Sequence, residues 1–170
     1  EGHTCDKTVE WTAWEGTTAL PTANGYYFLT EDVNLASLYY LKPGMDVKIC
    51  LNGHNITINN ESKSRVVSSY SNSTHQSDAK ITFTDCAETP GAIVNPNMAN
   101  KNDGGVLWSL GTNEMNLFRV TVKVLPGATN TKSGAVIGLG GGTVFNMYSG
   151  TIEGGTVKGA NTTIVAGGAI

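Results

Sequence analysis

Hydrophobic and polar residues alternate along short stretches of the chain, and each stretch is interrupted by a turn before the alternation resumes. The segment ICLNGHNITI, residues 49–58, alternates at its start, breaks at residues 52–54, and resumes at Ile56 and Ile58. Period-two alternation is typical of β-strands, because successive side chains point to opposite faces. No window has the i, i+3, i+4, i+7 apolar spacing of an amphipathic helix, so the sequence predicts an all-β protein.

The pattern recurs about every thirty residues in the second half of the chain. The residues from Gly104 onward align with those from Gly134 onward in type as well as position. The aligned pairs are Val106 and Val136, Leu107 and Ile137, Gly111 and Gly141, Asn116 and Asn146, Leu117 and Met147, Phe118 and Tyr148, Thr121 and Thr151, and Val122 and Ile152. An internal repeat of this length indicates a solenoid, in which each repeat buries its apolar face against its neighbours.

The repeating unit has two apolar residues at i and i+2 and a third five residues later. Its copies are Met115, Leu117 and Val122; Phe145, Met147 and Ile152; and Ile49, Leu51 and Ile56, with Ile81, Phe83 and Ile93 forming a fourth copy across a longer corner. A strand that turns sharply and resumes, once per repeat, predicts the coils of a right-handed parallel β-helix.

Residues 52–54 are therefore expected to form a corner between two faces of one coil. A β-hairpin is the alternative, because Asn-Gly between apolar runs is the strongest short hairpin signal. Against the hairpin, the equivalent corner of a later copy holds Arg119 and Val120, which a type I′ turn does not accept.

The first 44 residues do not fit the thirty-residue unit. They are rich in aromatic residues and carry turn signals at Leu20-Pro21 and Asn24-Gly25, which suits a β cap over the start of the solenoid. We therefore expect an N-terminal cap at 1–44 and coils at 45–170. The chain ends on Gly167-Gly-Ala-Ile170, a third copy of the coil start, which predicts further coils, end-to-end association or a partner fragment at this end.

Composition and charge narrow the classes of partner. The chain of 170 residues contains 21 glycines, and 15% of its residues are charged. Its formal net charge is −3. Without a cluster of Lys and Arg, the chain lacks the electrostatic footprint of a nucleic-acid-binding protein. No apolar stretch is long enough to span a bilayer, so membrane insertion is not expected.

Three cysteines, Cys5, Cys50 and Cys86, allow one disulfide. His3, Cys5, Cys50 and His54 could offer two nitrogens and two sulfurs to zinc, but the tight CxxC spacing of a structural zinc site is missing. A disulfide between Cys5 and Cys50 is the preferred prediction, because Cys50 lies between inward residues and so points outward. Cys86, in a corner, is the predicted free thiol, with a disulfide to Cys50 as its alternative role. Neither a metal nor a cofactor is expected.

The acidic residues do not form a catalytic set. None of them recurs at matching coil positions, whereas a β-helical lyase or hydrolase requires clustered acids or a basic group on one face. The alignment places Asp85 beside Arg119, which predicts a surface ion pair of little energetic weight. Asn116 and Asn146 are expected to form a side-chain ladder along the solenoid rather than to bind a sugar. Trp108 is the one ligand-binding candidate, as a platform on which a sugar could stack, but the preferred interpretation is that it belongs to the core or lies under the loop of residues 124–132.

At GHTCDKTVEWTAW, ICLNGHNITI, TFTDC and the GGVL, SGAV and GGTVFNMYSGTIEGG repeats, the chain resembles the N-terminal part of secreted right-handed parallel β-helix proteins of clostridial-type Gram-positive gut bacteria. These are pectate-lyase-like solenoids in fold, and many have no assigned catalytic role. The resemblance implies a secreted or cell-surface location and supplies no catalytic residues.

Two functions from different classes follow from these observations. The first is a non-catalytic extracellular module of the stalk or adhesin type, whose flat faces contact a glycan or a host surface protein. The second is the N-terminal portion of a polysaccharide lyase or glycoside hydrolase whose active site lies on later coils.

Overall fold

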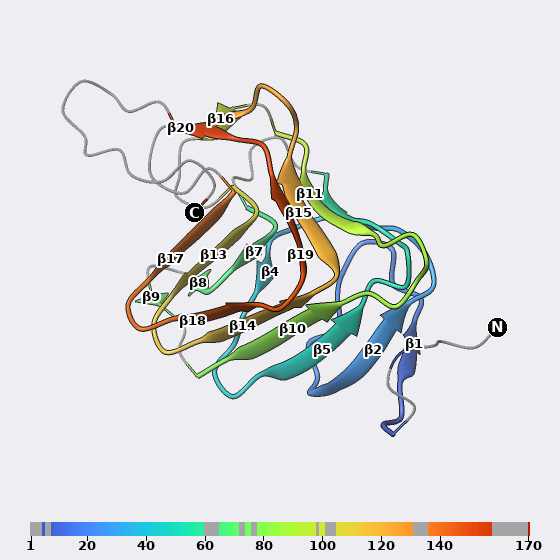
Figure 1. Ribbon diagram of the computed structural model, residues 1–170. Helices are drawn as coiled ribbons and strands as arrows, with labels where there is room; N and C mark the ends of the chain where they lie inside the picture. The colour runs from blue at the N-terminus through green and yellow to red at the C-terminus, as the bar shows by residue number, and fades with distance from the viewer. Residues whose placement is uncertain are drawn as a thin grey trace.

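The protein is built from β-strands that stack side by side in parallel sheets (Figure 1). The computed structural model describes residues 5, 8–59, 65–71, 74–75, 78–97, 99–100, 105–130, 136–157 and 170. No helix occurs among these residues, so the predicted all-β class is confirmed.

The largest sheet has six strands in the order β1-β2-β5-β10-β14-β18, and every neighbouring pair is parallel. We call it the six-stranded sheet. Its strands are β1 (Thr12–Trp14), β2 (Gly25–Leu29), β5 (Asp46–Cys50), β10 (Lys80–Thr84), β14 (Glu114–Phe118) and β18 (Val144–Met147).

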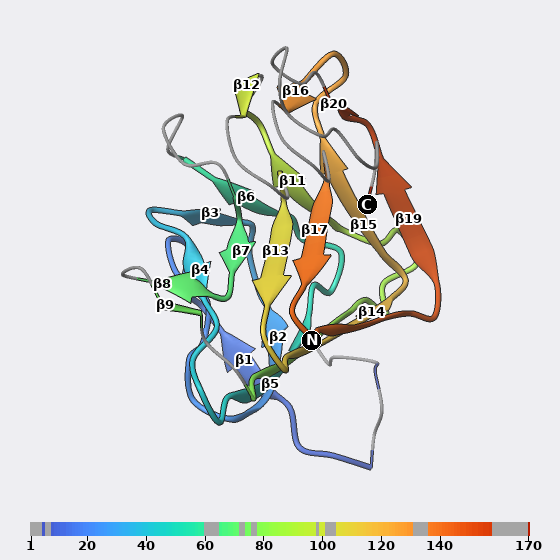
Figure 2. The same cartoon turned by 90° about the vertical axis from the view of Figure 1, so that its left-hand side faces the viewer.

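Two further parallel sheets form the other faces, as Figure 2 shows from the side of β13 and β17. The five-stranded sheet contains β3 (Val33–Leu35), β6 (Ile56–Ile58), β11 (Ala92–Asn95), β15 (Val120–Val124) and β19 (Gly150–Glu153). The four-stranded sheet contains β4 (Tyr39–Tyr40), β7 (Val67–Ser68), β13 (Leu107–Leu110) and β17 (Ile137–Gly140).

Two small sheets complete the described strands. A parallel one contains β12 (Ala99–Asn100), β16 (Thr129–Asn130) and β20 (Thr156–Val157). An antiparallel hairpin contains β8 (Tyr70–Ser71) and β9 (Thr74–His75).

The chain visits the three large sheets in turn, which makes the arrangement solenoid-like. One coil runs through β5, β6 and β7, and each of these strands pairs with the equivalent strand of the preceding coil, β2, β3 and β4. Residues 25–40 therefore already form a coil, and the boundary expected after residue 44 falls between two coils of the same sheets. The last coil start expected from the sequence, at residues 167–169, lies outside the described residues.

The thirty-residue repeat is confirmed in the register of the later coils. Glu114 pairs with Val144, Leu107 with Ile137 and Val120 with Gly150. The preceding step is longer, since Asn116 lies 34 positions after Thr82, its neighbour on β10. The extra residues lie in the corners, where insertions leave the strand pairing intact.

The register predicted for the coil that starts at β5 is wrong by two residues. Ile49 stands opposite Phe83, which in turn stands opposite Leu117, so Ile49 and not Leu51 is the equivalent of Leu117. Leu51 is also fully buried, but it lies past the end of β5 in the corner. The corners differ in length, and for this reason a fixed spacing across the corner gave the wrong alignment.

Residues 52–54 form a corner, as predicted. Strands β5 and β6 belong to different sheets, and Asn52 and Gly53 have φ values of 52° and 84°. Arg119, between β14 and β15, also takes a left-handed conformation, with φ of 56°. Both corners therefore turn through left-handed residues, although only one contains glycine.

The core lies between the sheets and consists of aliphatic residues from alternate strand positions. On the six-stranded sheet the inward residues of β5, β10 and β14 are buried; they are Val47, Ile49, Ile81, Phe83, Met115 and Leu117. The residues between them point outward and are free to shape the outer face of this sheet.

Candidate ligand-binding groove

The parallel register arranges the outward side chains of the six-stranded sheet in rows that cross the strands. The central row contains Tyr26, Lys48, Thr82, Asn116 and Asn146. The row on one side includes Lys80 and Glu114, and the row on the other includes Thr84 and Phe118. Because each strand adds one residue to every row, the outer face is patterned along the solenoid axis.

These rows line a groove with a volume of about 480 Å³. Its lining residues are Trp11, Tyr26, Lys48, Lys80, Thr82, Thr84, Glu114, Asn116, Phe118 and Tyr148. The groove crosses the strands from β2 to β14, which is three interstrand spacings or about 14 Å. It is therefore long enough for an extended oligomer and not only for a single small molecule.

Aromatic side chains stand at both ends of the groove. At one end Trp11 meets Tyr26 edge to face, with ring centroids 5.4 Å apart and an interplanar angle of 77°. At the other end Phe118 and Tyr148 stack in parallel, with centroids 4.3 Å apart and an angle of 8°. Tyr148 is 62% exposed, so this pair offers a ring face to a ligand.

The floor between the aromatic ends carries two lysines, and each one is paired with a carboxylate. Lys48 Nζ lies 3.0 Å from Asp46 Oδ1 and 4.5 Å from the centroid of the Tyr26 ring. Lys80 Nζ lies 2.9 Å from Glu114 Oε1. The formal charge of these two pairs is zero, and the groove offers both donors and acceptors.

Asn116 links the floor into a network. Its Nδ2 donates to Glu114 Oε1 at 2.8 Å and to Thr82 Oγ1 at 3.3 Å, while its Oδ1 accepts from Asn146 Nδ2 at 2.9 Å. The last contact is the side-chain ladder that the repeat predicted for Asn116 and Asn146. Asn116 is 5% exposed, so its hydrogen bonds fix the floor and leave Glu114 held in position.

This network keeps the charges of the groove fixed. Hydrogen bonds from Asn116 and then from Lys80 lower the pKa of Glu114 below its ordinary value of 4.5. The hydrogen bond to Glu114 raises the pKa of Lys80 above 10.5. Glu114 is therefore ionised and Lys80 protonated throughout the neutral range.

Trp108, the one ligand-binding candidate named from the sequence, does not line this groove. It lies on β13 in the four-stranded sheet, where it stands opposite Gly138, thirty positions further along the chain. The Arg65 guanidinium lies 4.3 Å from the centroid of its ring. A ring face covered by this cation is less open to a sugar, so the groove on the six-stranded sheet is the stronger candidate site.

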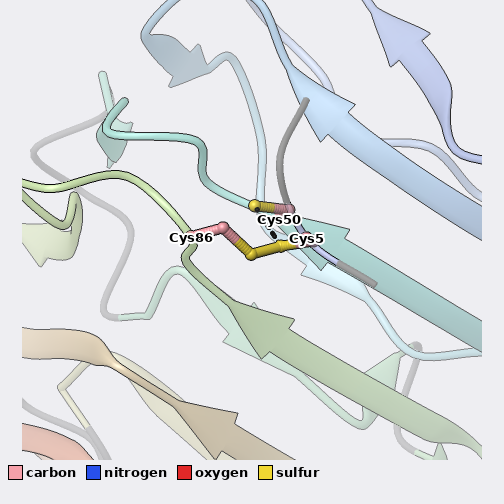
Figure 3. A group of neighbouring side chains, drawn as sticks. All are labelled: Cys5, Cys50 and Cys86. Carbon is pink, nitrogen blue, oxygen red and sulfur yellow. Dashed lines mark hydrogen bonds between the residues drawn. A yellow bond between two sulfur atoms is a disulfide. The ribbon is translucent and has the colours of Figure 1, made fainter. Parts of the chain in front are cut away.

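The disulfide joins Cys5 to Cys86, and Cys50 is a buried free cysteine (Figure 3). The predicted Cys5–Cys50 pairing is therefore corrected. Cys50 ends β5 opposite Thr84, and Cys86 follows Thr84 by two residues, so both cysteines reach the same place from adjacent coils. Cys5 could meet either of them, and spacing in the sequence does not separate the two pairings.

The other polar groups singled out from the sequence have structural contacts. Of the four residues that could offer ligands to zinc, Cys5 and Cys50 lie together with Cys86, and His3 lies outside the described residues. His54 contacts a carboxylate, with its Nδ1 3.5 Å from Asp32 Oδ1. The predicted surface ion pair between Asp85 and Arg119 is wrong. Asp85 is buried, and Arg119 Nη2 donates instead to the carbonyl oxygen of Ala87 at 3.1 Å.

The sequence did not predict the aromatic residues at the two ends of the groove. Phe118 and Tyr148 align in the thirty-residue repeat at an outward position, and this was the signal that could have identified them. Trp11 gave no such signal, because it precedes β1 and reaches the groove only through the pairing of β1 with β2.

The comparisons with known proteins assign no relatives: no family model, no curated protein and no solved structure matches the chain. The described residues contain no helix that is long and apolar enough to cross a membrane. The case for a function therefore depends on the groove.

Proposed function

We propose that the protein is a non-catalytic, extracellular module of the right-handed parallel β-helix type, related to the pectate-lyase-like solenoids, and that its groove binds an oligosaccharide. The observation that carries this proposal is a groove on the six-stranded sheet with aromatic rings at its ends and a hydrogen-bonding floor between them. The rings of Phe118 and Tyr148 are exposed, and those of Trp11 and Tyr26 are half-buried. Ring faces pack against the apolar faces of sugars, and polar groups orient the hydroxyls.

The charge of the floor favours a neutral glycan. Lys48 and Lys80 each lie within 3.0 Å of a carboxylate, so neither presents an uncompensated positive charge to an acidic sugar. Sugar hydroxyls both donate and accept, and they suit a floor where ammonium, amide and carboxylate groups alternate. An oligosaccharide of uronic acids would instead bring its carboxylates close to Glu114.

The chemistry of the groove favours binding over hydrolysis. Glycoside hydrolysis uses two carboxyl groups, one of them a general acid with a raised pKa. Glu114 is the one carboxylate among the described residues that line the groove, and its pKa is lowered. Lys80 is also unsuited to act as a general base, because its pKa is raised.

The disulfide supports the extracellular part of the proposal. Cys5 and Cys86 are bonded across 81 positions of the sequence. Disulfides persist in oxidising environments and are rare in the reducing cytosol. A secreted or surface-attached protein is therefore the expected setting for this chain.

A glycan array probed with the full chain, followed by calorimetric titration of the best neutral oligosaccharide, tests the proposal. Phe118→Ala should weaken binding. Leu139→Ala is the matched control, because Leu139 is equally exposed, at 37%, but lies on the four-stranded sheet outside the groove, and this variant should bind like the parent. Equal binding by both variants, or no binding to any neutral glycan, would contradict the proposal. Release of reducing ends from the bound glycan would show an enzyme instead.

A further inference from the structure

The sulfur atoms of three cysteines lie together beside the groove. A structural disulfide uses only two of them, so the third has no part in that bond. The Sγ atoms of Cys5, Cys50 and Cys86 all lie within 4.8 Å of one another (Figure 3). Cys50 Sγ is 3.3 Å from Cys5 Sγ, although Cys5 is already bonded to Cys86. Cys5 carries no proton in this state, so the thiol of Cys50 is the group that can donate toward it.

We propose that these cysteines form an intramolecular thiol–disulfide exchange site, in which Cys50 takes the place of Cys86 as the partner of Cys5. The Cys50 thiolate attacks Sγ of Cys5, a Cys50–Cys5 bond forms, and the Cys5–Cys86 bond breaks with its electron pair on Cys86. The proton lost by Cys50 to water is matched by one that Cys86 takes up. The step has no net oxidation or reduction and needs no external reagent.

The backbone of the solenoid allows both bonded states. Cys50 and Thr84 are neighbours on β5 and β10, and Cys86 follows Thr84 by two residues, so Cys5 lies at the junction of two adjacent coils. The Sγ atoms of Cys50 and Cys86 lie within 4.8 Å of each other, so a change of partner moves the point to which Cys5 is bonded by no more than that distance. Each bonded state keeps Cys5 tethered to the six-stranded sheet.

The exchange converts a hidden thiol into a more accessible one. Cys50 is fully buried, whereas Cys86 is half-buried in the corner after β10. Cys50 is in register with Thr84, which lines the groove, and Cys5 lies six positions before Trp11, which also lines it. The exchange site therefore borders the groove, but the proposal does not depend on what the groove binds.

The environment of Cys50 sets the rate. Burial raises its pKa to about 11, and the nearby carboxylate of Asp85 raises it as well, against hydrogen bonds from the backbone of Asn52 and Cys86. At pH 7 about one molecule in ten thousand then has a Cys50 thiolate. We expect the exchange to be slow at neutral pH and to accelerate about tenfold per pH unit up to about pH 11.

Disulfide mapping of the full chain tests the proposal. The protein is incubated at several pH values without added thiol, and its free thiols are then blocked with N-ethylmaleimide in mildly acidic denaturant. Trypsin separates the three cysteines into the peptides 1–7, 49–63 and 81–101. At pH 7 the label should lie on Cys50, and at higher pH it should move to Cys86 at a rate that does not depend on protein concentration.

Two results would overturn the exchange site. The first is a label that stays on Cys50 after hours at pH 10.5. The second comes from the variant Cys86→Ser, which should form the Cys5–Cys50 disulfide on mild oxidation. If this variant keeps the native circular dichroism spectrum but retains two free thiols, the proposal is contradicted. Cys50→Ser is the control, since it should keep the Cys5–Cys86 bond at every pH.

Discussion

Phe118 and Tyr148 stack with ring centroids 4.3 Å apart, although thirty positions of the chain separate them. The stack follows from the register, since Leu117 pairs with Met147 and the next residue of each coil points outward. Truncating one ring leaves the other without its partner. Tyr148→Ala should therefore weaken glycan binding roughly three- to tenfold, the effect of one aromatic contact.

Isothermal titration of the parent chain and the variant measures this change. Tyr148→Phe is the matched control, because it retains the ring and should keep most of the affinity. An alanine variant that binds as tightly as the parent would show that the stacked pair is not part of the binding site.

The sequence predicted those features of the fold that depend on local pattern. The alternation around Ile56 predicted strands, and the alignment of Asn116 with Asn146 predicted both the register and their hydrogen bond. The predicted register of Ile49 was wrong because the hydrophobic pattern does not show how many residues each corner has. The disulfide partner predicted for Cys5 was wrong. Cys50 and Cys86 are 36 positions apart in the sequence but lie next to each other on adjacent coils, so the sequence does not distinguish between them.

The candidate site was not predictable by the same means. Each row of the groove takes one residue from each coil, so neighbours in the central row are separated by 22 positions, between Tyr26 and Lys48, to 34 positions, between Thr82 and Asn116. Such a set has no local motif, and Trp11 lies outside the repeat altogether. The site becomes visible only when the register of all six strands is known.

Glycan binding should depend on pH at the acid end. The pKa of Glu114 lies below 4.5 and that of Lys80 above 10.5, so their ion pair is intact from about pH 5 to about pH 10. A lowered carboxyl pKa favours the charged, paired state above the pKa, and this contribution is lost as the pH falls through it. We expect constant affinity in the neutral range and weaker binding below pH 4.5.

Titrations at a series of pH values check this expectation, with Glu114→Gln as the comparison. The glutamine variant has no charge to lose and should show no acid limb. An acid limb of equal size in both proteins would assign the loss to another group.

The disulfide should contribute substantially to stability through its long loop. It spans 81 positions, and the loop-closure model gives about 4.5 kcal/mol for a loop of this length. Cys5→Ser should lose that amount in urea unfolding. Cys86→Ser should lose much less after mild oxidation, because Cys50, 45 positions from Cys5, can take its place. Equal losses in the two variants would contradict this substitution.

Gly91 has no room for a side chain. A Cβ atom at this position would lie 1.8 Å from the carbonyl oxygen of His54, which belongs to the backbone of the neighbouring corner and cannot turn away. Gly91→Ala should therefore lower the free energy of unfolding by about 3 kcal/mol or more.

Gly44→Ala separates this collision from backbone strain. Gly44 has φ of 74°, but a Cβ atom at this position would meet nothing within 4 Å, so the variant should lose only about 1–2 kcal/mol. Urea unfolding of the two variants gives the comparison. A smaller loss for Gly91→Ala than for Gly44→Ala would mean that the two corners can move apart.

Asp85 should be the polar side chain on which the corners depend most. It is 2% exposed, and its carboxylate accepts hydrogen bonds from the backbone N–H groups of Gly53, Ala87 and Gly91 at 2.8 to 3.2 Å. Gly53 belongs to the preceding coil, so one carboxylate joins two corners. Asp85→Ala leaves these donors without their acceptor, and each unsatisfied buried donor costs about 1–3 kcal/mol.

We expect Asp85→Ala to lower the free energy of unfolding by about 4 kcal/mol, measured by urea denaturation. Asp85→Asn should fall between the parent and the alanine variant, because one oxygen remains as an acceptor while the amide group faces an N–H. Asp46→Ala is the control for removal of a carboxylate, since its pairing with Lys48 is a partly exposed ion pair that contributes at most about 1 kcal/mol. If the alanine variants at 85 and 46 were equally stable, solvent would have to reach the three N–H groups, and the corner would be more open than its buried carboxylate indicates.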